Sequence, residues 1–489
     1  MKKLQLFVLL TMLCSTQLIL AEQPNTIWTA WFNSPFNSTD EATCCIVDNK
    51  GHLYVTGRSN IDREKYLTVG YDATTGDTIW TFVYGDSATD YEANGCDVDD
   101  SGNVYITGFN SYYKGFQYVS DWVTIKYKPS IHDTIWTRRY SDPISGWDAP
   151  VSCVYDQKNN VLFVCGMYPI IVFKYNATTG DTIWKREFDF LNSSPCHATL
   201  YDSRFLFITG IDNGQDILTL KIDATIGDTV WSNKLHGTGS AGYGDFGRCC
   251  VTDSFGNLYV AGATYNGENY DYIAIKYDPE SGDTIWTRKY NSPFNKDDYS
   301  SGCAVFGKNL FVTGRSNNGS NYDWLTINYN TDTGDTVWTC RYNDSYNSDD
   351  VANACVIDKQ GYLYITGAAY NGANWDYYTV KYSTVTGVAN TLPNNTHASL
   401  ILSQSRPNPF RQSTTISYQT AGPDHISLMV YNAAGQKIKT LADARQNAGT
   451  HSVSWNGCDE KGNKTCSGVY FIRLQAGEQI ATHRSIKIK

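Results

Sequence analysis

A short phrase that recurs along the chain constrains the fold more than any other feature of the sequence. The phrase Gly-Asp-Thr-Ile/Val-Trp, with variants in the first and third copies, ends at seven tryptophans: Trp28, Trp80, Trp136, Trp184, Trp231, Trp286 and Trp338. Successive tryptophans lie 47–56 residues apart. A period of this length is typical of architectures that repeat one supersecondary unit. We therefore expect a repeat fold.

Each period contains four strand-like pieces. In the sixth period these pieces are Ser301–Phe306, Asn309–Gly314, Trp324–Tyr329 and Asp335–Tyr342. In several copies an Asp-x-x-Gly turn separates the first two pieces. Four antiparallel strands in about 50 residues describe one blade of a β-propeller.

The two ends of the repeat region complement each other. The last repeat ends after its third strand, Tyr377–Tyr382, whereas Asn25–Phe32 is a tryptophan strand with no repeat before it. We expect the N-terminal strand to complete the last blade, because ring closure removes the open sheet edges. The predicted fold is therefore all-β, with a seven-bladed propeller over residues 22–390 and a small β-sandwich after it.

The repeats resemble a known family. The pattern Asp-x-x-Gly-Asn-Val/Leu-Tyr-x-x-Gly, followed by Asp-x-x-x-x-Lys-Tyr, is most complete at Asp99–Gly108 with Asp121–Tyr127 and at Asp253–Gly262 with Asp271–Trp286. It is similar to the bacterial SBBP-type β-propeller repeats over about three quarters of the chain. This resemblance implies a seven-bladed propeller and no single activity. The tryptophans also resemble the docking tryptophans of quinoprotein propellers, and we expect them to pack between blades.

The N-terminus is typical of an export signal. Lys2 and Lys3 precede a mostly apolar stretch that ends at Ala21, so residues 1–21 are predicted to be a signal peptide. A membrane anchor and a lipid-modified Cys14 are the alternatives. The mature protein is then secreted or held at the cell surface after passage through the periplasm. The net charge of −10 argues against a nucleic-acid partner.

A second module follows the repeats. Residues 391–399 form a polar linker, and residues 400–489 contain short alternating strands with motifs such as Pro407–Phe410 and Val453–Gly457. These motifs resemble the Ig-like C-terminal domain of type IX secretion cargo and of flagellar hook-capping proteins. The resemblance implies a sorting domain whose partner is the outer-membrane secretion machinery. A structural sandwich without a sorting role is the alternative.

The cysteines form two groups. One cysteine recurs at one position of the predicted innermost strand: Cys45, Cys96, Cys153, Cys250, Cys303 and Cys355. We expect these six to be buried thiols, because equivalent positions of neighbouring blades are too far apart for a disulfide. The vicinal pairs Cys44-Cys45 and Cys249-Cys250 resemble the vicinal disulfide of some quinoproteins, which generally have eight blades. Cys458 and Cys466 flank a turn in the second module and are a candidate disulfide, with two free thiols as the alternative.

One segment resembles the start of a calcium loop. Asp97, Asp99, Ser101 and Asn103 have the required spacing, but Gly108 stands where the closing acidic residue belongs. Calcium is therefore the one candidate cofactor, and an ordinary hairpin turn is the alternative.

Two sets of aspartates are predicted on one loop face of the propeller. The first set lies five residues before the repeat cysteine: Asp40, Asp148, Asp245, Asp298 and Asp350. The second set recurs between the second and third strands: Asp121, Asp216, Asp271, Asp323 and Asp376. Aromatic residues such as Tyr270, Tyr322 and Trp375 lie beside the second set, and rings with carboxylates and amides suit sugar recognition. The alternative is structural: the aspartates cap loop amides and pair with the lysine five residues on.

Motifs of common enzymes do not occur, including His-Glu-x-x-His and Gly-x-Ser-x-Gly. We therefore predict a binding or scaffold protein that recognises a glycan or a surface protein. An enzyme that acts on polysaccharide through loop-face carboxylates is the second hypothesis. A structural surface or adhesion protein is the third.

Overall fold

The computed structural model describes residues 24–384 and 401–488, apart from residues 35–36, 142–148, 167–168, 189–193, 213–215, 237–243, 345, 403–404, 406, 421–423, 433–435, 448 and 477–478. The chain divides into two compact units between Gly387 and Val388. The predicted signal peptide and linker lie outside the described residues. No helix in the described part has the length and apolar character needed to cross a bilayer.

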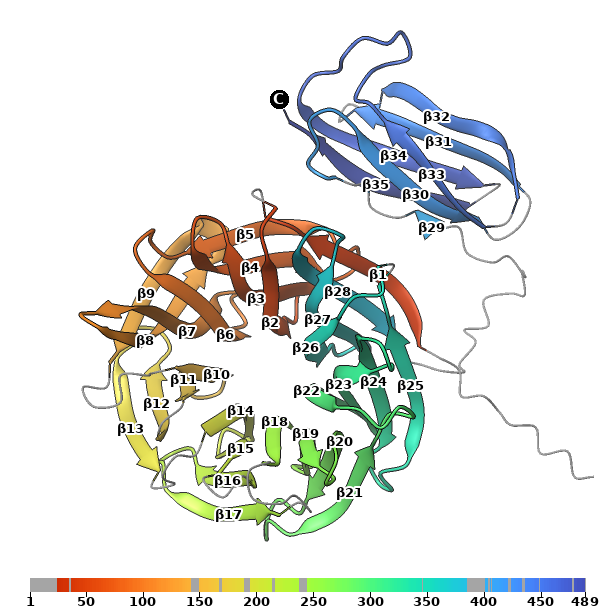
Figure 1. Ribbon diagram of the computed structural model, residues 1–489. Helices are drawn as coiled ribbons and strands as arrows, with labels where there is room; N and C mark the ends of the chain where they lie inside the picture. Colours follow the sequence, from red (N-terminus) through yellow and green to blue (C-terminus); the bar gives the residue numbers. More distant parts are fainter. Residues whose placement is uncertain are drawn as a thin grey trace, which may run out of the picture. The chain divides into compact units, whose positions relative to one another are not determined.

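The N-terminal unit is a β-propeller whose four-stranded antiparallel sheets surround a common axis (Figure 1). The first sheet comprises β2 (Asp40–Val47), β3 (His52–Asn60), β4 (Glu64–Asp72) and β5 (Thr78–Tyr84). The second comprises β6 (Asp90–Val98), β7 (Val104–Lys114), β8 (Gln117–Lys128) and β9 (Asp133–Tyr140), with the short 3-10 helix η1 (Pro129–Ile131) before β9. The third comprises β10 (Pro150–Asp156), β11 (Val161–Gly166), β12 (Ile170–Asn176) and β13 (Thr182–Phe188).

The remaining sheets of this unit follow in chain order. They comprise β14 (Ser194–Tyr201), β15 (Phe205–Ile211), β16 (Ile217–Asp223) and β17 (Thr229–Leu235); β18 (Phe246–Thr252), β19 (Leu258–Tyr265), β20 (Tyr270–Tyr277) and β21 (Thr284–Tyr290); β22 (Asp298–Phe306), β23 (Asn309–Asn317), β24 (Tyr322–Asn330) and β25 (Thr336–Tyr342); and β26 (Val351–Ile357), β27 (Tyr362–Tyr370), β28 (Trp375–Ser383) and β1 (Asn25–Phe32).

The N-terminal strand closes the ring, as predicted. Strand β1 pairs antiparallel with β28, from Asn25 opposite Ser383 to Phe32 opposite Tyr377. In Figure 1 the red β1 therefore lies against the last sheet of the propeller, beside the blue-green β28. This pairing joins the first and last repeats by backbone hydrogen bonds.

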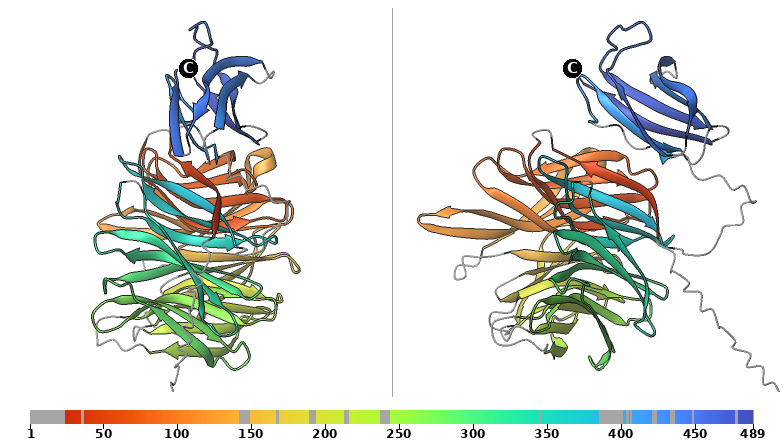
Figure 2. Two further views of the ribbon diagram at one scale, coloured as in Figure 1. Left: turned by 90° about the vertical axis from the view of Figure 1, so that its right-hand side faces the viewer. Right: turned by 45° about the vertical axis from the view of Figure 1, so that its right-hand side comes forward.

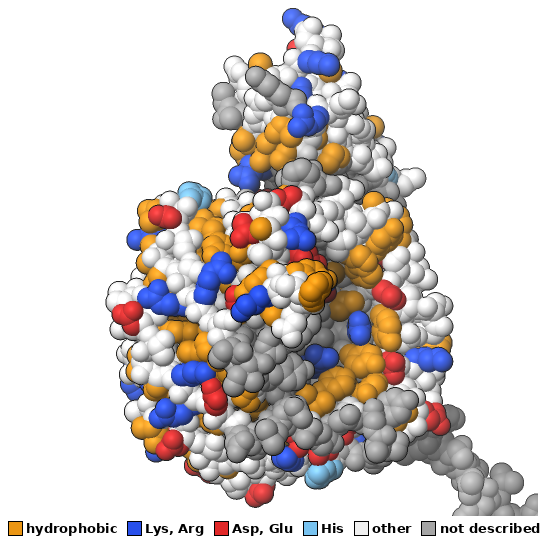
Figure 3. Space-filling view, turned by 60° about the vertical axis from the view of Figure 1, so that its left-hand side comes forward, with side chains coloured by type: hydrophobic (Ala, Val, Ile, Leu, Met, Phe, Trp, Pro, Cys, Tyr) orange, Lys and Arg blue, Asp and Glu red, His pale blue; other side chains and the backbone are white. Residues whose placement is uncertain are grey.

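Burial explains the residue pattern within each blade. The two middle strands are buried on both faces, as in β4, because each sheet packs between two others. The outer strands alternate between more and less exposed residues, as in β5, so their outward residues reach solvent. On the side of the molecule drawn in Figure 3, basic and acidic side chains lie interspersed among apolar ones.

The repeated tryptophans dock each blade onto the next. The indole N–H of Trp28 donates to the Ala73 carbonyl of the following sheet at 3.1 Å, and Trp136 donates to Ala177 at 3.2 Å. Gly76 of the following blade lies against Trp28 with φ 76°, and a Cβ there would come within 2.8 Å of the indole ring. The glycine of the repeated phrase is therefore needed both for its backbone conformation and for this close approach.

The repeated lysines complete the same contact. Trp28 lies opposite Lys381 in the β1–β28 ladder, and the Lys381 ammonium also donates to Ala73 O at 2.7 Å. Lys126, on the strand beside Trp136, likewise donates to Ala177 O at 3.0 Å. Each such carbonyl thus receives one indole N–H and one ammonium from the preceding blade.

The C-terminal unit is a two-sheet β-sandwich. One sheet has the order β29 (Ile401–Leu402), β30 (Thr414–Thr420), β33 (Gly449–Trp455), and the other has the order β32 (Lys437–Gln446), β31 (Asp424–Asn432), β34 (Gly468–Ala476), β35 (Gln479–Lys487). Figure 2 shows the two sheets of this unit from two further directions. Their inward side chains form one apolar cluster around the fully buried Trp455.

The predicted disulfide of this unit is not formed in the structure. Cys458 is a buried free thiol, and Cys466 is an exposed one. Cys458 forms a bridge with Lys464, so Cys466 lies two residues beyond the position opposite Cys458. The Cys458 thiol instead donates to the carbonyl of Asn456 at 3.7 Å.

Candidate functional site

The first aspartate set lies beneath the loop face. The described members, Asp40, Asp245, Asp298 and Asp350, are at most 4% exposed, and Asp148 lies outside the described residues. Asp40 accepts a hydrogen bond from the Ser34 amide at 2.6 Å, and Asp298 accepts one from the Ser292 amide at 2.6 Å. These carboxylates therefore hold the loops that enter each blade, and they are not among the groups that a ligand on this face would meet.

Burial sets the protonation of these carboxylates. It raises the pKa of Asp40, while the nearby Ser59 hydroxyl and the hydrogen bond from the Ser34 amide act in the opposite direction. The pKa of Asp350 is raised to about 7, first by burial and then by the nearby charges of Asp344 and Asp323. Asp350 therefore carries a proton for part of the time at neutral pH.

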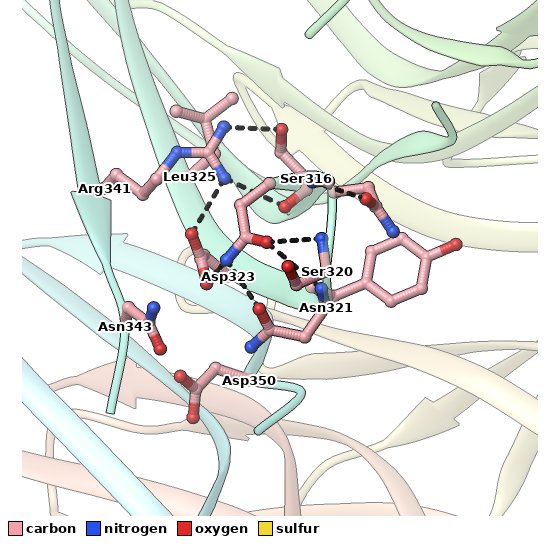
Figure 4. Close-up of polar contacts among 12 residues, drawn as sticks. Ser316, Ser320, Asn321, Asp323, Leu325, Arg341, Asn343 and Asp350 are labelled. Carbon is pink, nitrogen blue, oxygen red and sulfur yellow. Dashed lines mark hydrogen bonds and ion pairs between the residues drawn. The ribbon is translucent and has the colours of Figure 1, made fainter. Parts of the chain in front are cut away.

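The second aspartate set organises the hairpins between the second and third strands. Asn266 donates to Asp271 at 2.8 Å, and Asn318 donates to Asp323 at 2.9 Å. The Asp323 carboxylate also pairs with Arg341 at 3.1 Å, and Arg341 donates to Ser316 as well (Figure 4). These contacts support the structural interpretation, in which the aspartates fix the hairpin.

The lysine pairing proposed for this set is wrong. Lys126, five residues after Asp121, pairs with Asp99 at 3.3 Å and binds the next blade. Asp121 instead accepts a hydrogen bond from the Tyr112 hydroxyl at 3.1 Å. Side chains alternate between the faces of a strand, so residues five apart point to opposite faces.

The same hairpins also join neighbouring blades through hydrogen bonds. The side-chain amide of Asn321 donates to the Ser348 carbonyl in the loop that enters the following blade. Asn374 makes the equivalent bond to Ser38 O, which joins the last blade to the first. The Tyr322 backbone N–H adds a bond to Asp349 at 2.9 Å.

An aromatic cluster crosses the loop face of two blades. It consists of the half-buried rings Phe246, Tyr270, Tyr299 and Tyr322. The Phe246 and Tyr270 centroids lie 5.3 Å apart, and those of Tyr270 and Tyr299 lie 5.2 Å apart. The Arg315 guanidinium bridges the next gap, 5.0 Å from the Tyr299 ring and 4.9 Å from the Tyr322 ring. The rings and the cation thus form a continuous surface.

The structure places two of the three predicted aromatic residues in this cluster. Tyr270 and Tyr322 belong to it, whereas the third predicted aromatic residue, Trp375, lies next to Tyr370 in another blade. Phe246, Tyr299 and Arg315 were missed. Phe246 and Tyr299 directly follow Asp245 and Asp298, so an aromatic residue after the first-set aspartate is the signal that could have found them.

An acidic cluster occupies the equivalent positions of the first blade. Arg58 pairs with Glu41 at 2.7 Å, with Glu64 at 3.0 Å and with Glu92 of the next blade at 3.4 Å. Glu41 lies opposite Arg58 in the β2–β3 ladder, just as Tyr299 lies opposite Arg315 in the β22–β23 ladder. The two clusters therefore occupy the same register positions.

A cavity of about 140 Å³ lies on the propeller axis among the innermost strands. Some of the residues that line it make a polar contact with the following blade. Thr43 donates to Ala93 O at 2.7 Å, and Asn353 donates to Ala42 O at 2.8 Å. His197 also lines it, and burial lowers the pKa of this imidazole to about 4, so it is neutral at pH 7. Most side chains here are used to join blades.

The candidate calcium segment forms a hairpin turn. The Asp99 carboxylate accepts bonds from the amides of Ser101 and Asn103 at 3.0 and 2.9 Å and pairs with Lys126. Asp97 instead accepts a bond from the Tyr155 amide of the next blade at 2.7 Å. Among the described residues, no group of three or more His, Cys, Asp or Glu side chains is placed to hold a metal ion.

Two protein-family models match parts of the chain. The model of the FlgD Ig-like domain matches residues 407–479, which confirms the hook-capping resemblance of the C-terminal unit. The model of the outer membrane protein assembly factor BamB matches residues 133–369 in the propeller. No curated protein matches the chain. The SBBP repeat type and the sorting role stay predictions.

Three solved structures are similar to large parts of the chain. Hydrazine synthase of Kuenenia stuttgartiensis is 12% identical, covers 73% of this chain and 100% of its own, and has a TM-score of 0.53. Quinohemoprotein alcohol dehydrogenase of Comamonas testosteroni is 13% identical, with coverages of 69% and 67% and a TM-score of 0.40. PorZ, a surface component of the type IX secretion system of Porphyromonas gingivalis, is 13% identical, with coverages of 94% and 60% and a TM-score of 0.40. The first of these matches supports the fold alone.

Proposed function

We propose that this chain is an exported, seven-bladed β-propeller that binds a glycan through the aromatic cluster. The observation that carries the proposal is the continuous half-buried surface formed by Phe246, Tyr270, Tyr299 and Tyr322 with Arg315. Aromatic rings bind the apolar C–H faces of sugars, and a guanidinium donates to hydroxyl or carboxylate oxygens. Both chemistries meet here on one surface, which suits a chain-like ligand.

The C-terminal unit suggests how the propeller reaches its ligand. The match to the FlgD Ig-like domain supports the resemblance to type IX sorting domains, and residues 1–21 have the pattern of a signal peptide. The protein would then cross the periplasm, engage the outer-membrane secretion machinery and end secreted or at the cell surface. In this proposal the propeller is the exported, ligand-binding part, and the C-terminal sandwich is its sorting domain.

A polysaccharide-cleaving enzyme is the second candidate. Asp350, with a pKa near 7, lies close to Asp344 and Asp323, and a carboxyl group of raised pKa beside another carboxylate is what a general acid requires. Asp350 is fully buried, however, and its carboxylate accepts a hydrogen bond from the Asp344 backbone amide at 2.8 Å. The buried position of Asp350 therefore favours a binding protein over an enzyme that uses this residue as its acid.

The test is a glycan array probed with the mature chain, residues 22–489, with and without calcium. We expect binding that Tyr299→Ala weakens at least ten-fold, which corresponds to about 1.4 kcal/mol. Glu41→Ala, at the same register position of the first blade, is the control and should leave binding unchanged.

Three other outcomes would change the conclusion. An array without binding would favour a protein ligand or the structural and adhesion role. Equal losses for Tyr299→Ala and Glu41→Ala would place the ligand elsewhere. Release of shorter sugars that stops in Asp350→Asn would favour the enzyme. Thermal unfolding of each variant shows whether it is folded.

A further inference from the structure

Two pairs of cysteines meet across blade junctions at the propeller axis. The Cys44 sulfur, on β2, accepts a hydrogen bond from the Cys96 amide of β6 at 3.4 Å. The Cys44 thiol also faces the Cys96 carbonyl at 3.9 Å, and the nearness of the two thiols lowers the pKa of Cys44 and raises that of Cys96. Cys249 of β18 and Cys303 of β22 occupy the same ladder positions as Cys44 and Cys96, just beyond the bulge of each innermost strand.

The backbone explains why these pairs meet. The residue just before the repeat cysteine points toward the amide of the repeat cysteine in the next blade. Gly95 and Gly302 occupy this earlier position, and a Cβ on them would lie 3.1 Å from Cys153 N and 2.9 Å from Cys355 N. Two thiols therefore meet only where the earlier position is itself a cysteine, as at Cys44 and Cys249 within the described blades.

This geometry also changes the interpretation of the vicinal pairs. Positions offset by one residue approach each other across the blade junction. Cys44 is therefore a partner of Cys96 in the next blade and not of its chain neighbour Cys45. The resemblance to a vicinal quinoprotein disulfide does not describe these residues.

We propose that Cys44–Cys96 and Cys249–Cys303 form two interblade disulfides when the protein is oxidised. The oxidant is a low-molecular-weight or protein disulfide. The Cys44 thiolate attacks it and releases one thiol, and the Cys96 thiolate then attacks the mixed disulfide and releases the second thiol. The two protein thiols lose two electrons and two protons, which the oxidant takes up as its two thiols. All four cysteines line the axial cavity of about 140 Å³.

Oxidation in the cell rests on the proposed export, because disulfides persist in oxidising compartments. The chemical proposal itself does not, since oxidation can be tested on purified protein. A propeller is held together by contacts between neighbouring blades, and each crosslink would join two blades at the axis. The disulfides would therefore slow the separation of β2 from β6 and of β18 from β22.

The test uses the mature chain, treated with oxidised glutathione or with reductant, then unfolded, alkylated and digested. Of the thirteen cysteines that follow Ala21, we expect four to escape alkylation in the oxidised sample. Mass spectrometry should then find the peptide of Cys44 linked to that of Cys96, and the peptide of Cys249 linked to that of Cys303. The unfolding midpoint should fall when reductant is added.

Variants separate this proposal from general oxidation. Cys44→Ser should remove the first crosslink and leave the second, whereas Cys45→Ser, its chain neighbour, should leave both. Full alkylation of the unfolded oxidised protein would overturn the proposal, and so would a Cys44–Cys45 or Cys249–Cys250 linkage. The wild-type result stands even if a variant fails to fold. If purified protein forms these crosslinks but protein recovered from the producing cell lacks them, the result would count against export and not against the chemical proposal.

Discussion

The acidic cluster and the aromatic cluster occupy equivalent positions of two blades but consist of different residues. In the first blade Arg58 lies among Glu41, Glu64 and Glu92, whereas in the sixth repeat the equivalent Arg315 lies between Tyr299 and Tyr322. The ladder register at these positions is the same. The repeat therefore fixes where side chains lie, and the residues that vary between repeats decide what each part of the loop face can bind. The comparison predicts that only the aromatic cluster engages a glycan.

A buried aspartate lies beside each cluster, and a third blade has one whose pKa is affected by other aspartates. Asp40 lies under Glu41 and faces Ser59, and Asp298 lies under Tyr299 and faces Ser316. Burial raises the pKa of both aspartates, and the neighbouring serine hydroxyls act against this effect. The pKa of Asp350 is raised to about 7, by burial and by the nearby charges of Asp344 and Asp323.

The largest effect is expected from Asp350→Asn. An aspartate that titrates near pH 4 when unfolded and near pH 7 when folded binds more protons in the folded state between these values. Its contribution to stability is complete below about pH 4 and is lost as the pH rises through 7. Each pKa unit corresponds to about 1.4 kcal/mol. Asp350→Asn should therefore be the more stable protein above pH 7, by about 1–3 kcal/mol.

Urea unfolding at pH 5 and pH 8 measures this effect. Asp40→Asn is the matched control, because Asp40 occupies the same repeat position but serines, and not other aspartates, act on its pKa. It should change the pH dependence less than Asp350→Asn does. A wild-type midpoint that does not fall between pH 5 and pH 8 would contradict the shift at Asp350.

A smaller effect is expected from removing each arginine. Arg58→Ala leaves three glutamates near one another, and the half-buried Glu92 already has a pKa raised by burial and by Glu64 and Glu41. We expect a loss of about 1 kcal/mol at low salt that shrinks in concentrated salt, since ions screen partly exposed pairs. Arg315→Ala should show a weaker salt dependence, because the rings carry no net charge. Thermal unfolding in a salt series compares the two, and identical salt slopes would remove the distinction between the clusters.

The sequence predicted the strands of the propeller and its ring closure better than the arrangement of side chains on its surface. The repeated tryptophans, the four strands per period and the closing strand at Asn25 follow from a local pattern that each repeat restates. The docking role of Lys381 was missed, because it depends on a carbonyl in the next blade. The first-set aspartates were expected on the loop face. They turn inward because loop amides such as Ser34 N require acceptors where water is excluded.

Contacts between blades account for the other differences. Tyr299 and Phe246 become one surface with Tyr270 only when two sheets stand side by side, and no spacing within one repeat encodes this distance. The Cys44–Cys96 contact depends on an offset of one residue between neighbouring innermost strands. Features inside one blade were therefore predictable from the repeat, whereas features shared by two blades required their relative placement.

The smallest effect on stability, and the sharpest test of the comparison, is Tyr322→Glu. Tyr322 and Glu64 both begin the third strand of their blade, so the substitution places the residue of the acidic cluster beside Arg315. Arg315 should exchange one cation–π contact for an ion pair of similar strength, and the free energy of unfolding should change by less than about 0.5 kcal/mol. Glycan binding should nevertheless fall at least ten-fold, because the continuous ring surface ends at Tyr299. A variant that binds like the wild type would show that Tyr322 contributes packing and not recognition.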